Sequence, residues 1–175
     1  MLTMQRTLPK QRRSRHYKPL TIQLSRVRET TGIHAASPKA IRDYFRDVAD
    51  LAQEAFWTVT LNTKNKIINR HMISLGVVDA TIVHPREVIR PAIQDAARAI
   101  VIVHNHPGGS VEPSDQDIAV SHQIYWVARL IEIELLDSVI IARRGKCGMR
   151  HYSLRESGHL DRFKADPLPG SVLTA

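Results

Sequence analysis

The sequence contains a single cysteine, Cys147, among its 175 residues. One cysteine excludes an internal disulfide bond and any metal site built from several thiolates. It also excludes the zinc nucleobase deaminases, whose sites need two closely spaced cysteines. Because Cys147 lies in the polar run Arg144-Gly145-Lys146-Cys147-Gly148, we predict a basic hairpin there and not a nucleophilic thiol.

Long apolar runs are also missing from the chain. No stretch approaches the roughly 18 apolar residues that a membrane-spanning helix needs, and the first residues lack the apolar centre of a secretion signal. These absences predict a soluble, cytoplasmic protein that does not bind a membrane. The length suits one domain of ordinary size with tails.

Acidic residues are absent from residues 1–28, which carry eight basic ones. Basic and acidic residues balance in the rest of the chain, so the formal net charge of +8 resides in this segment. We predict that residues 1–36 form a flexible basic arm that binds nucleic acid phosphates without sequence preference. A solvated extension without a specific partner and an organelle transit peptide are the alternatives. The residues expected to contact phosphates are Arg6, Lys10, Arg12, Arg13, Arg15 and Lys18.

A compact group of metal-ligand side chains follows the apolar run at 99–103. This run is β-branched and too short for a helix, so we expect a buried strand that ends at His104 and His106. The two-residue spacing puts both imidazoles on one face of that strand. The chain then turns at Pro107-Gly108-Gly109, and a helical pattern begins whose first turn carries Asp117. The sequence therefore predicts that two imidazoles and one carboxylate meet at one point.

Two imidazole nitrogens and one carboxylate oxygen suit Zn²⁺, and three protein ligands leave the fourth tetrahedral position open for water. An open position is typical of a catalytic site, where the ion lowers the pKa of its water to about 7 and polarises a substrate carbonyl. A His-x-His pair on a strand is by itself more often incidental than a ligand pair. The carboxylate at Asp117 favours ligation here.

The pattern His-x-His-Pro, six residues, Ser-x-x-Asp resembles the signature of the JAB/MPN superfamily, whose members are also called JAMM metalloproteases. The matching residues are His104, His106, Pro107, Ser114 and Asp117.

Flanking segments at 61–65, 83–88 and 103–109 resemble the RadC-like branch of this superfamily, and the resemblance covers about residues 36–160. It implies a single α/β domain with a mixed, curved sheet flanked by helices, layered as in cytidine deaminases. Longer members carry an N-terminal helical domain, so the chain resembles the short form. The chain departs from the branch where an Asp-His pair appears as Asp137-Ser138.

The resemblance also implies roles for two further residues. Glu54, on an expected helix or at its end, would take a proton from the metal-bound water and deliver it to the leaving nitrogen. The Ser114 hydroxyl would stabilise the oxyanion of a tetrahedral intermediate. Plainer interpretations exist: Glu54 is a surface residue that ends an amphipathic helix, and Ser114 forms a capping box with Asp117. The two interpretations of Ser114 are compatible.

Periodicity and turn residues predict the order of the elements. Ser37 and Pro38 are a typical helix start, and an apolar face recurs from Ile41 to Leu51. The expected helices span about residues 38–53, 85–98 and 114–130, and the expected strands 56–61, 66–74, 99–103, 133–142 and 150–154. These elements predict a domain over residues 37–160, followed by a loose tail over 161–175.

The sequence therefore favours a zinc-dependent hydrolase that cleaves a peptide or isopeptide bond in an unidentified substrate. An alternative is a DNA-associated accessory protein of repair or mobile-element biology, in which the metal site is structural or vestigial. Retention of Glu54 together with all three ligands favours catalysis, whereas the basic arm favours DNA.

Overall fold

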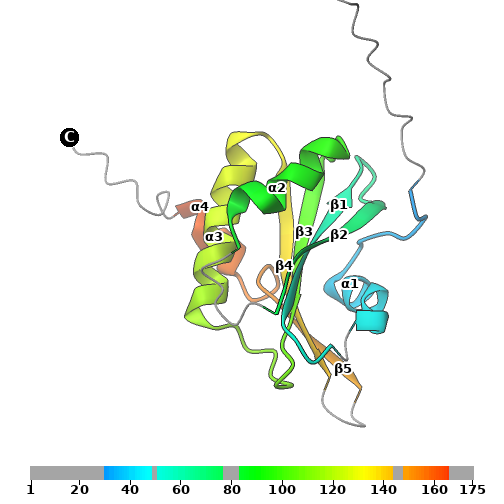
Figure 1. The fold of residues 1–175 in the computed structure, drawn as a ribbon. Helices are drawn as coiled ribbons and strands as arrows, with labels where there is room; N and C mark the ends of the chain where they lie inside the picture. Colours follow the sequence, from blue (N-terminus) through cyan, green and yellow to red (C-terminus); the bar gives the residue numbers. More distant parts are fainter. Residues whose placement is uncertain (1–29, 49–50, 77–82, 144–147, 166–175) are drawn as a thin grey trace, which may run out of the picture.

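The computed structural model describes residues 30–48, 51–76, 83–143 and 148–165. These residues form one α/β domain, as expected (Figure 1). Its elements, in chain order, are α1 (Pro38–Tyr44), the 3-10 helix η1 (Arg46–Val48), β1 (Ala55–Leu61), β2 (Ile67–Leu75), α2 (Pro85–Gln94), β3 (Ala99–Asn105), α3 (Asp115–Leu130), β4 (Glu134–Arg143), β5 (Met149–Ser153) and α4 (His159–Ala165).

The five strands form one sheet in the order β2-β1-β3-β4-β5. Strands β3 and β4 run parallel, and the other neighbouring pairs are antiparallel, so the predicted mixed sheet is confirmed. Helices α2, α3 and α4 cover one face of the sheet, and α1 covers the other (Figure 1). None of the described helices is long and apolar enough to cross a membrane.

Strand β3 lies at the centre of the sheet and is buried along its whole length. Ile100 and Ile102 pack into the core under α2 and α3, whereas Val101 and Val103 pack into the core under α1. A central strand that is covered on both faces needs apolar residues at every position, which explains its uninterrupted apolar sequence. Polar side chains at the end of β3 are therefore shielded from water.

The first helix is shorter than predicted. Helix α1 ends at Tyr44, and the next residue, Phe45, is fully buried with its ring edge-on to Trp57. The predicted apolar face continued to Leu51 because Val48 and Leu51 do pack on this core, although α1 does not extend to them and only the short η1 reaches Val48. The prediction that Glu54 lies on a helix or at its end was therefore wrong: it directly precedes β1.

The second helix also ends early, at Gln94 instead of about residue 98. The carboxylate of the next residue, Asp95, accepts a hydrogen bond from the Thr60 hydroxyl at 2.7 Å and lies 2.7 Å from Nε2 of His71. These contacts attach the end of α2 to the sheet, and Ala96 then turns the chain with a φ of 49°.

Both ends of the folded domain extend beyond the predicted boundaries of 37 and 160. At the start, Thr31 donates to the Ile67 carbonyl at 3.0 Å, and Ile67 donates to the Ile33 carbonyl at 2.9 Å. At the other end, α4 buries Leu160 and Phe163, so the expected loose tail begins with a packed helix. Packing of this kind depends on the sheet surface, which local sequence patterns do not reveal.

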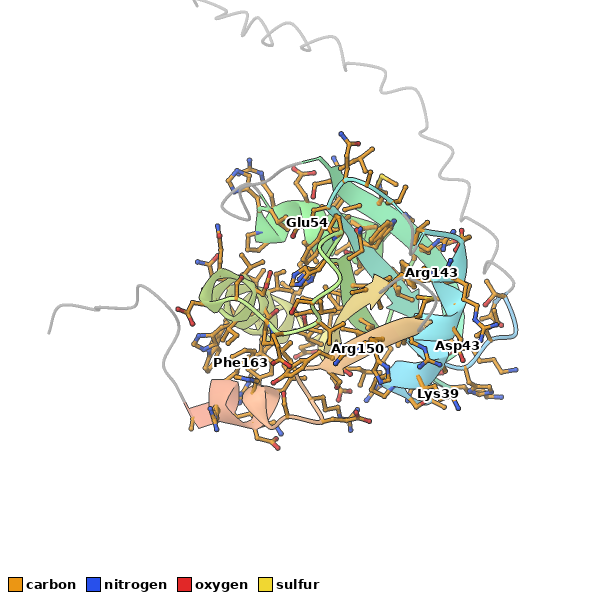
Figure 2. The ribbon with its side chains drawn as sticks, turned by 90° about the horizontal axis from the view of Figure 1, so that it is seen from below. Lys39, Asp43, Glu54, Arg143, Arg150 and Phe163 are labelled. Carbon is orange, nitrogen blue, oxygen red and sulfur yellow. The ribbon has the colours of Figure 1, made fainter. Side chains whose placement is uncertain are left out.

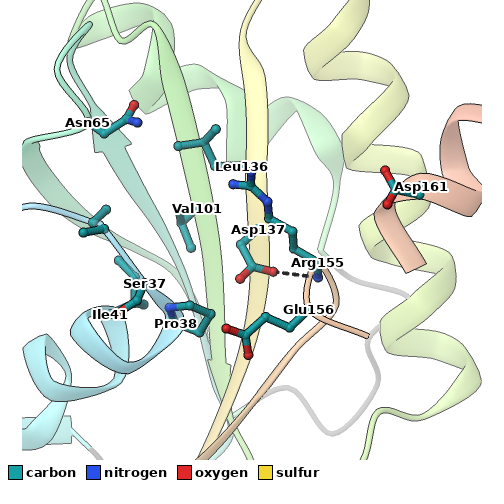
Figure 3. Close-up of a pocket in the computed structure, with 12 residues that line it drawn as sticks. Ser37, Pro38, Ile41, Asn65, Val101, Leu136, Asp137, Arg155, Glu156 and Asp161 are labelled. Atoms are coloured by element: carbon teal, nitrogen blue, oxygen red, sulfur yellow. Dashed lines mark hydrogen bonds between the residues drawn. The ribbon is translucent and has the colours of Figure 1, made fainter. Parts of the chain in front are cut away.

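Asp137 is a buried carboxylate that connects β4 to the turn after β5 (Figure 3). Its Oδ1 accepts hydrogen bonds from the backbone N–H groups of Ser138 at 2.8 Å and Arg155 at 3.0 Å. Its Oδ2 accepts from the Ser153 hydroxyl at 2.6 Å. Burial raises the pKa of Asp137, although these hydrogen bonds oppose the shift. The carboxylate lies beside an open pocket of about 610 Å³.

We expect Asp137→Ala to lower the free energy of unfolding by about 2–4 kcal/mol, because three donors, in two buried hydrogen bonds and one partly buried one, lose their acceptor. Asp137→Asn should cost less than about 1 kcal/mol, since one amide oxygen can still accept from both N–H groups. Urea denaturation followed by circular dichroism measures both values. Equal losses in the two variants would contradict the acceptor role.

A comparison of wild type with Asp137→Asn tests how the stability of the fold depends on pH. A folded-state pKa above the ordinary aspartate value of 3.8 means that protonation of Asp137 stabilises the fold. This contribution is complete below the unfolded pKa and is lost as the pH rises through the folded pKa. Compared with Asp137→Asn, which cannot titrate at this position, wild type should therefore lose stability as the pH rises above about 4.

Candidate metal centre

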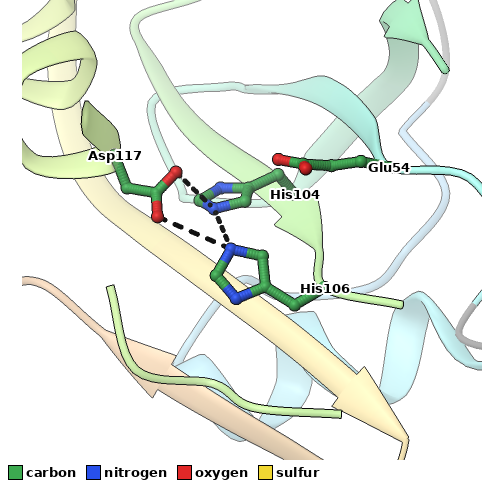
Figure 4. A group of neighbouring side chains, drawn as sticks. All are labelled: Glu54, His104, His106 and Asp117. Atoms are coloured by element: carbon green, nitrogen blue, oxygen red, sulfur yellow. Dashed lines mark hydrogen bonds and ion pairs between the residues drawn. The ribbon is translucent and has the colours of Figure 1, made fainter. Parts of the chain in front are cut away.

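Four side chains from three separate parts of the chain converge at the end of β3: Glu54, His104, His106 and Asp117 (Figure 4). One ligand atom from each lies within 4.8 Å of the others. Glu54 directly precedes β1, the two histidines lie at the end of β3 and just beyond it, and Asp117 lies in the first turn of α3.

The distances among the three expected ligands fit a small tetrahedral ion. Nε2 of His104 lies 3.1 Å from Nε2 of His106 and 3.1 Å from Oδ1 of Asp117. Nε2 of His106 lies 3.5 Å from Oδ2 of Asp117. Ligands that surround an ion tetrahedrally, with bonds of about 2.0–2.1 Å, are roughly 3.3–3.4 Å apart. These three residues are therefore placed to hold a metal ion.

Each imidazole is held by a different contact. The ring of His104 is 3% exposed and stacks on the ring of Phe56, with an interplanar angle of 8°. Nδ1 of His106 lies 3.1 Å from the carbonyl oxygen of Ser110. In the neutral ring, a proton on this Nδ1 donates to that carbonyl and leaves Nε2 unprotonated, which is the form that binds metals.

The electrostatics of the cluster favour a bound cation. Burial alone raises the pKa of Asp117, but hydrogen bonds from His104, His106 and Ser114 outweigh it and hold that pKa well below its ordinary value. The hydrogen bond to Asp117 in turn raises the pKa of His106, against the effect of burial. An ionised carboxylate beside two imidazoles concentrates lone pairs at one point, and a metal ion satisfies them by replacing the protons.

Ser114 forms the N-cap of α3, so the predicted capping box is confirmed. Its hydroxyl donates to Oδ2 of Asp117 at 2.7 Å, and its backbone N–H donates to the same oxygen at 2.8 Å. The backbone N–H of Asp117 donates to the Ser114 hydroxyl at 3.2 Å. The start of the helix thereby fixes the orientation of a metal ligand. The oxyanion role of Ser114 stays a prediction.

An open pocket of about 370 Å³ gives access to the cluster. Its walls come from the residue before β1, the loop after β3 and the first turn of α3. Its lining residues are Glu54, His106, Pro107, Gly108, Ser110, Ser114, Gln116 and Asp117. A substrate in this pocket would meet the Glu54 carboxylate and the ligand atoms together. The six basic residues expected to contact nucleic acid lie outside the described residues.

Sequence reasoning missed Asn105, which is 1% exposed and bonds to residues on both sides of Glu54. A signal was present, because a polar residue at the end of a buried strand needs partners for its amide. It also missed the contact between His106 and Ser110. That contact uses a backbone carbonyl, which every residue has, so no residue type could reveal it.

Comparison with known proteins identifies the family of the chain. The family model of the RadC-like JAB domain matches residues 35–159 of the chain. UPF0758 proteins of Pelodictyon phaeoclathratiforme, Halalkalibacterium halodurans and Staphylococcus carnosus are 42%, 44% and 38% identical to the chain, over 70%, 63% and 75% of its length. The aligned regions cover 54%, 45% and 56% of these relatives, so the chain spans about half of their length. The family match includes all four residues of the cluster, and the chain therefore belongs to the RadC-like JAB domain family of the JAB/MPN superfamily.

Proposed function

We propose that this protein is a zinc-dependent hydrolase that cleaves an amide bond in a peptide or isopeptide. The observation that carries the proposal is the cluster of three candidate ligands with a second carboxylate, Glu54, beside it at an open pocket. The donor set of two imidazoles and one carboxylate, at nearly tetrahedral spacings, favours Zn²⁺ over the larger, oxygen-seeking Ca²⁺. Membership of a superfamily with many metalloproteases supports the same conclusion.

In this proposal His104, His106 and Asp117 hold the ion through the atoms that now face one another. When bound, Zn²⁺ supplies a Lewis acid that polarises a carbonyl group and lowers the pKa of a coordinated water to about 7. Ser114 keeps the Asp117 carboxylate oriented toward the imidazoles through its hydroxyl and its backbone N–H.

Glu54 is the group that moves the proton. Its carboxylate accepts a proton from the attacking water as the water oxygen bonds to the carbonyl carbon. The same proton is then delivered to the nitrogen as the carbon–nitrogen bond breaks, so the amine leaves as a neutral group. The Ser114 hydroxyl, turned from Asp117 toward the pocket, would donate to the oxyanion that develops between these steps.

A second proposal is supported by the basic charge: the protein binds DNA as an accessory factor in repair or mobile-element biology, and its metal site is structural. Besides the arm, Arg42, Arg46 and Arg143 line an open pocket of about 280 Å³ between α1 and the end of the β4–β5 pair. Asp43 pairs with Arg42 at 2.8 Å and with Arg46 at 3.3 Å, which offsets part of this charge. Figure 2 shows Lys39 and Arg143 on the same side of the domain as Asp43, away from Glu54.

Replacing a ligand should remove the metal while the domain stays folded. Wild-type protein should hold about one zinc per chain, and His106→Ala or Asp117→Ala should retain little, because an ion held by the two remaining ligands dissociates readily. Elemental analysis of purified protein measures the metal. The matched controls are His84→Ala, an exposed N-cap histidine whose side chain makes no capping hydrogen bond to α2, and Asp115→Ala, an exposed residue in the same helical turn as Asp117. Equal zinc in all these proteins would contradict the ligand assignment.

Glu54→Gln should separate proton transfer from metal binding. The variant keeps the size of the side chain but loses its basic carboxylate, so zinc should remain while the rate of amide hydrolysis falls about 10²- to 10⁴-fold. Cleaved products are found by sequencing new N-termini in a proteome treated with each protein. Glu112→Gln, at an exposed glutamate in the loop before α3, serves as the control. Loss of zinc from Glu54→Gln would make Glu54 a ligand, and an unchanged rate would remove it from the mechanism.

Deleting residues 1–28 should abolish salt-sensitive DNA binding and preserve the zinc content, because the net charge of the chain resides in this arm. Fluorescence anisotropy at several salt concentrations measures the affinity. Arg46→Ala with Arg143→Ala, which removes charge from the domain instead, provides the comparison. An affinity that survives the deletion would assign DNA binding to the domain, around Arg143, Arg144, Lys146 and Arg150.

A further inference from the structure

Asn105, which separates the two histidines in sequence, directs its side chain to the other face of β3. Successive residues of a strand alternate between faces, so His104 points toward the ligand cluster and Asn105 points toward the core under α1. The residue is 1% exposed, and every one of its amide contacts in the described structure goes to the segment from Leu51 to Ala55.

These contacts hold the backbone on both sides of Glu54. Oδ1 of Asn105 accepts a hydrogen bond from the backbone N–H of Ala55 at 2.8 Å. Nδ2 donates to the carbonyl oxygens of Gln53 at 3.1 Å and Leu51 at 3.4 Å. One side chain therefore acts as acceptor on the C-terminal side of Glu54 and as donor on its N-terminal side.

The end of β2 adds a further restraint on the same segment. The backbone N–H of Gly76 donates to the carbonyl oxygen of Glu54 at 2.8 Å. Gly76 has a φ of +74°, and a Cβ atom there would lie 3.0 Å from the side chain of Gln53. The segment that carries Glu54 belongs to no helix or strand, so these hydrogen bonds supply the support that regular structure gives elsewhere.

We propose that Asn105 is a positioning residue for Glu54: it fixes the backbone that presents this carboxylate to the metal-ligand cluster. The proposal rests on the proton-transfer role proposed for Glu54. A carboxamide suits the task because it combines an acceptor with two donors, whereas a carboxylate offers acceptors alone and a hydroxyl offers one donor. The tripeptide His104-Asn105-His106 thereby supplies two of the three proposed ligands and positions the proposed proton carrier.

The test compares Asn105→Ala and Asn105→Asp with Thr58→Val and wild type. Thr58 is a matched control because it is fully buried on β1 and donates one side-chain hydrogen bond, to the Val88 carbonyl at 3.1 Å. Asn105→Asp keeps the size of the side chain and its acceptor oxygen but loses the N–H donors. It replaces Asn105→Ala if the alanine variant does not fold. Hydrogen exchange with mass spectrometry follows the amides of residues 51–56 against the rest of the domain.

In both Asn105 variants, exchange at residues 51–56 should rise about ten-fold, because hydrogen bonds to this segment are lost. Thr58→Val should leave that segment unchanged. The Co²⁺ forms of the proteins give the second readout, since Co²⁺ takes similar ligands and absorbs visible light. Glu54→Gln should alter the spectrum, Asn105→Ala should alter it in the same sense, and the double variant should differ little from Glu54→Gln.

Unchanged exchange at residues 51–56, or a rise of equal size across the whole domain, would overturn the positioning role of Asn105. Additive spectral changes in the double variant would also overturn it, because Asn105 would then act on the metal independently of Glu54. Failure of the proposed function has a different signature: Glu54→Gln would leave both the Co²⁺ spectrum and the rate of hydrolysis unchanged, while the exchange in Asn105→Ala still rises.

Discussion

The candidate site depends on the contacts that the Asp117 carboxylate makes. On one side it accepts hydrogen bonds from the hydroxyl and the backbone N–H of Ser114, which close the first turn of α3. On the other side it lies within 3.1–3.5 Å of the imidazoles of His104 and His106. A buried carboxylate is costly unless its partners satisfy it. The same hydrogen bonds that start the helix therefore orient a ligand toward β3.

Strand β3 holds the two histidines in position for these contacts. Its apolar residues are buried on both faces, so the strand is held firmly where the histidines emerge. Because side chains alternate along a strand, His104 points to the face where the ligand cluster lies, and Asn105 points to the opposite face, toward the segment that carries Glu54. Hydrogen bonds from Asn105 to the residues beside Glu54 thus oppose small displacements of Glu54 relative to His104 and His106.

The two proposed functions use different parts of the molecule. The ligand cluster lies at the carboxyl end of β3, whereas Arg42, Arg46 and Arg143 line a pocket between α1 and the β4–β5 pair. The candidate metal cluster and this basic pocket are therefore physically separate, so the two proposals do not exclude each other. A hydrolase whose basic surface brings it to DNA would reconcile the two proposals.

The sequence by itself determined the features that short-range chemistry controls. The apolar run at 99–103 specified a buried strand, the spacing of His104, His106 and Asp117 predicted that these side chains meet, and Ser114 specified a helix cap. Tertiary structure decided where the chain departs from its local patterns. The side chains of Val48 and Leu51 pack on the core whether or not the backbone around them is helical. Their periodicity therefore did not show that α1 ends at Tyr44. Contacts from Asn105 and Gly76, distant in sequence, then placed Glu54 beside the ligands, because only the folded sheet brings these strand ends together.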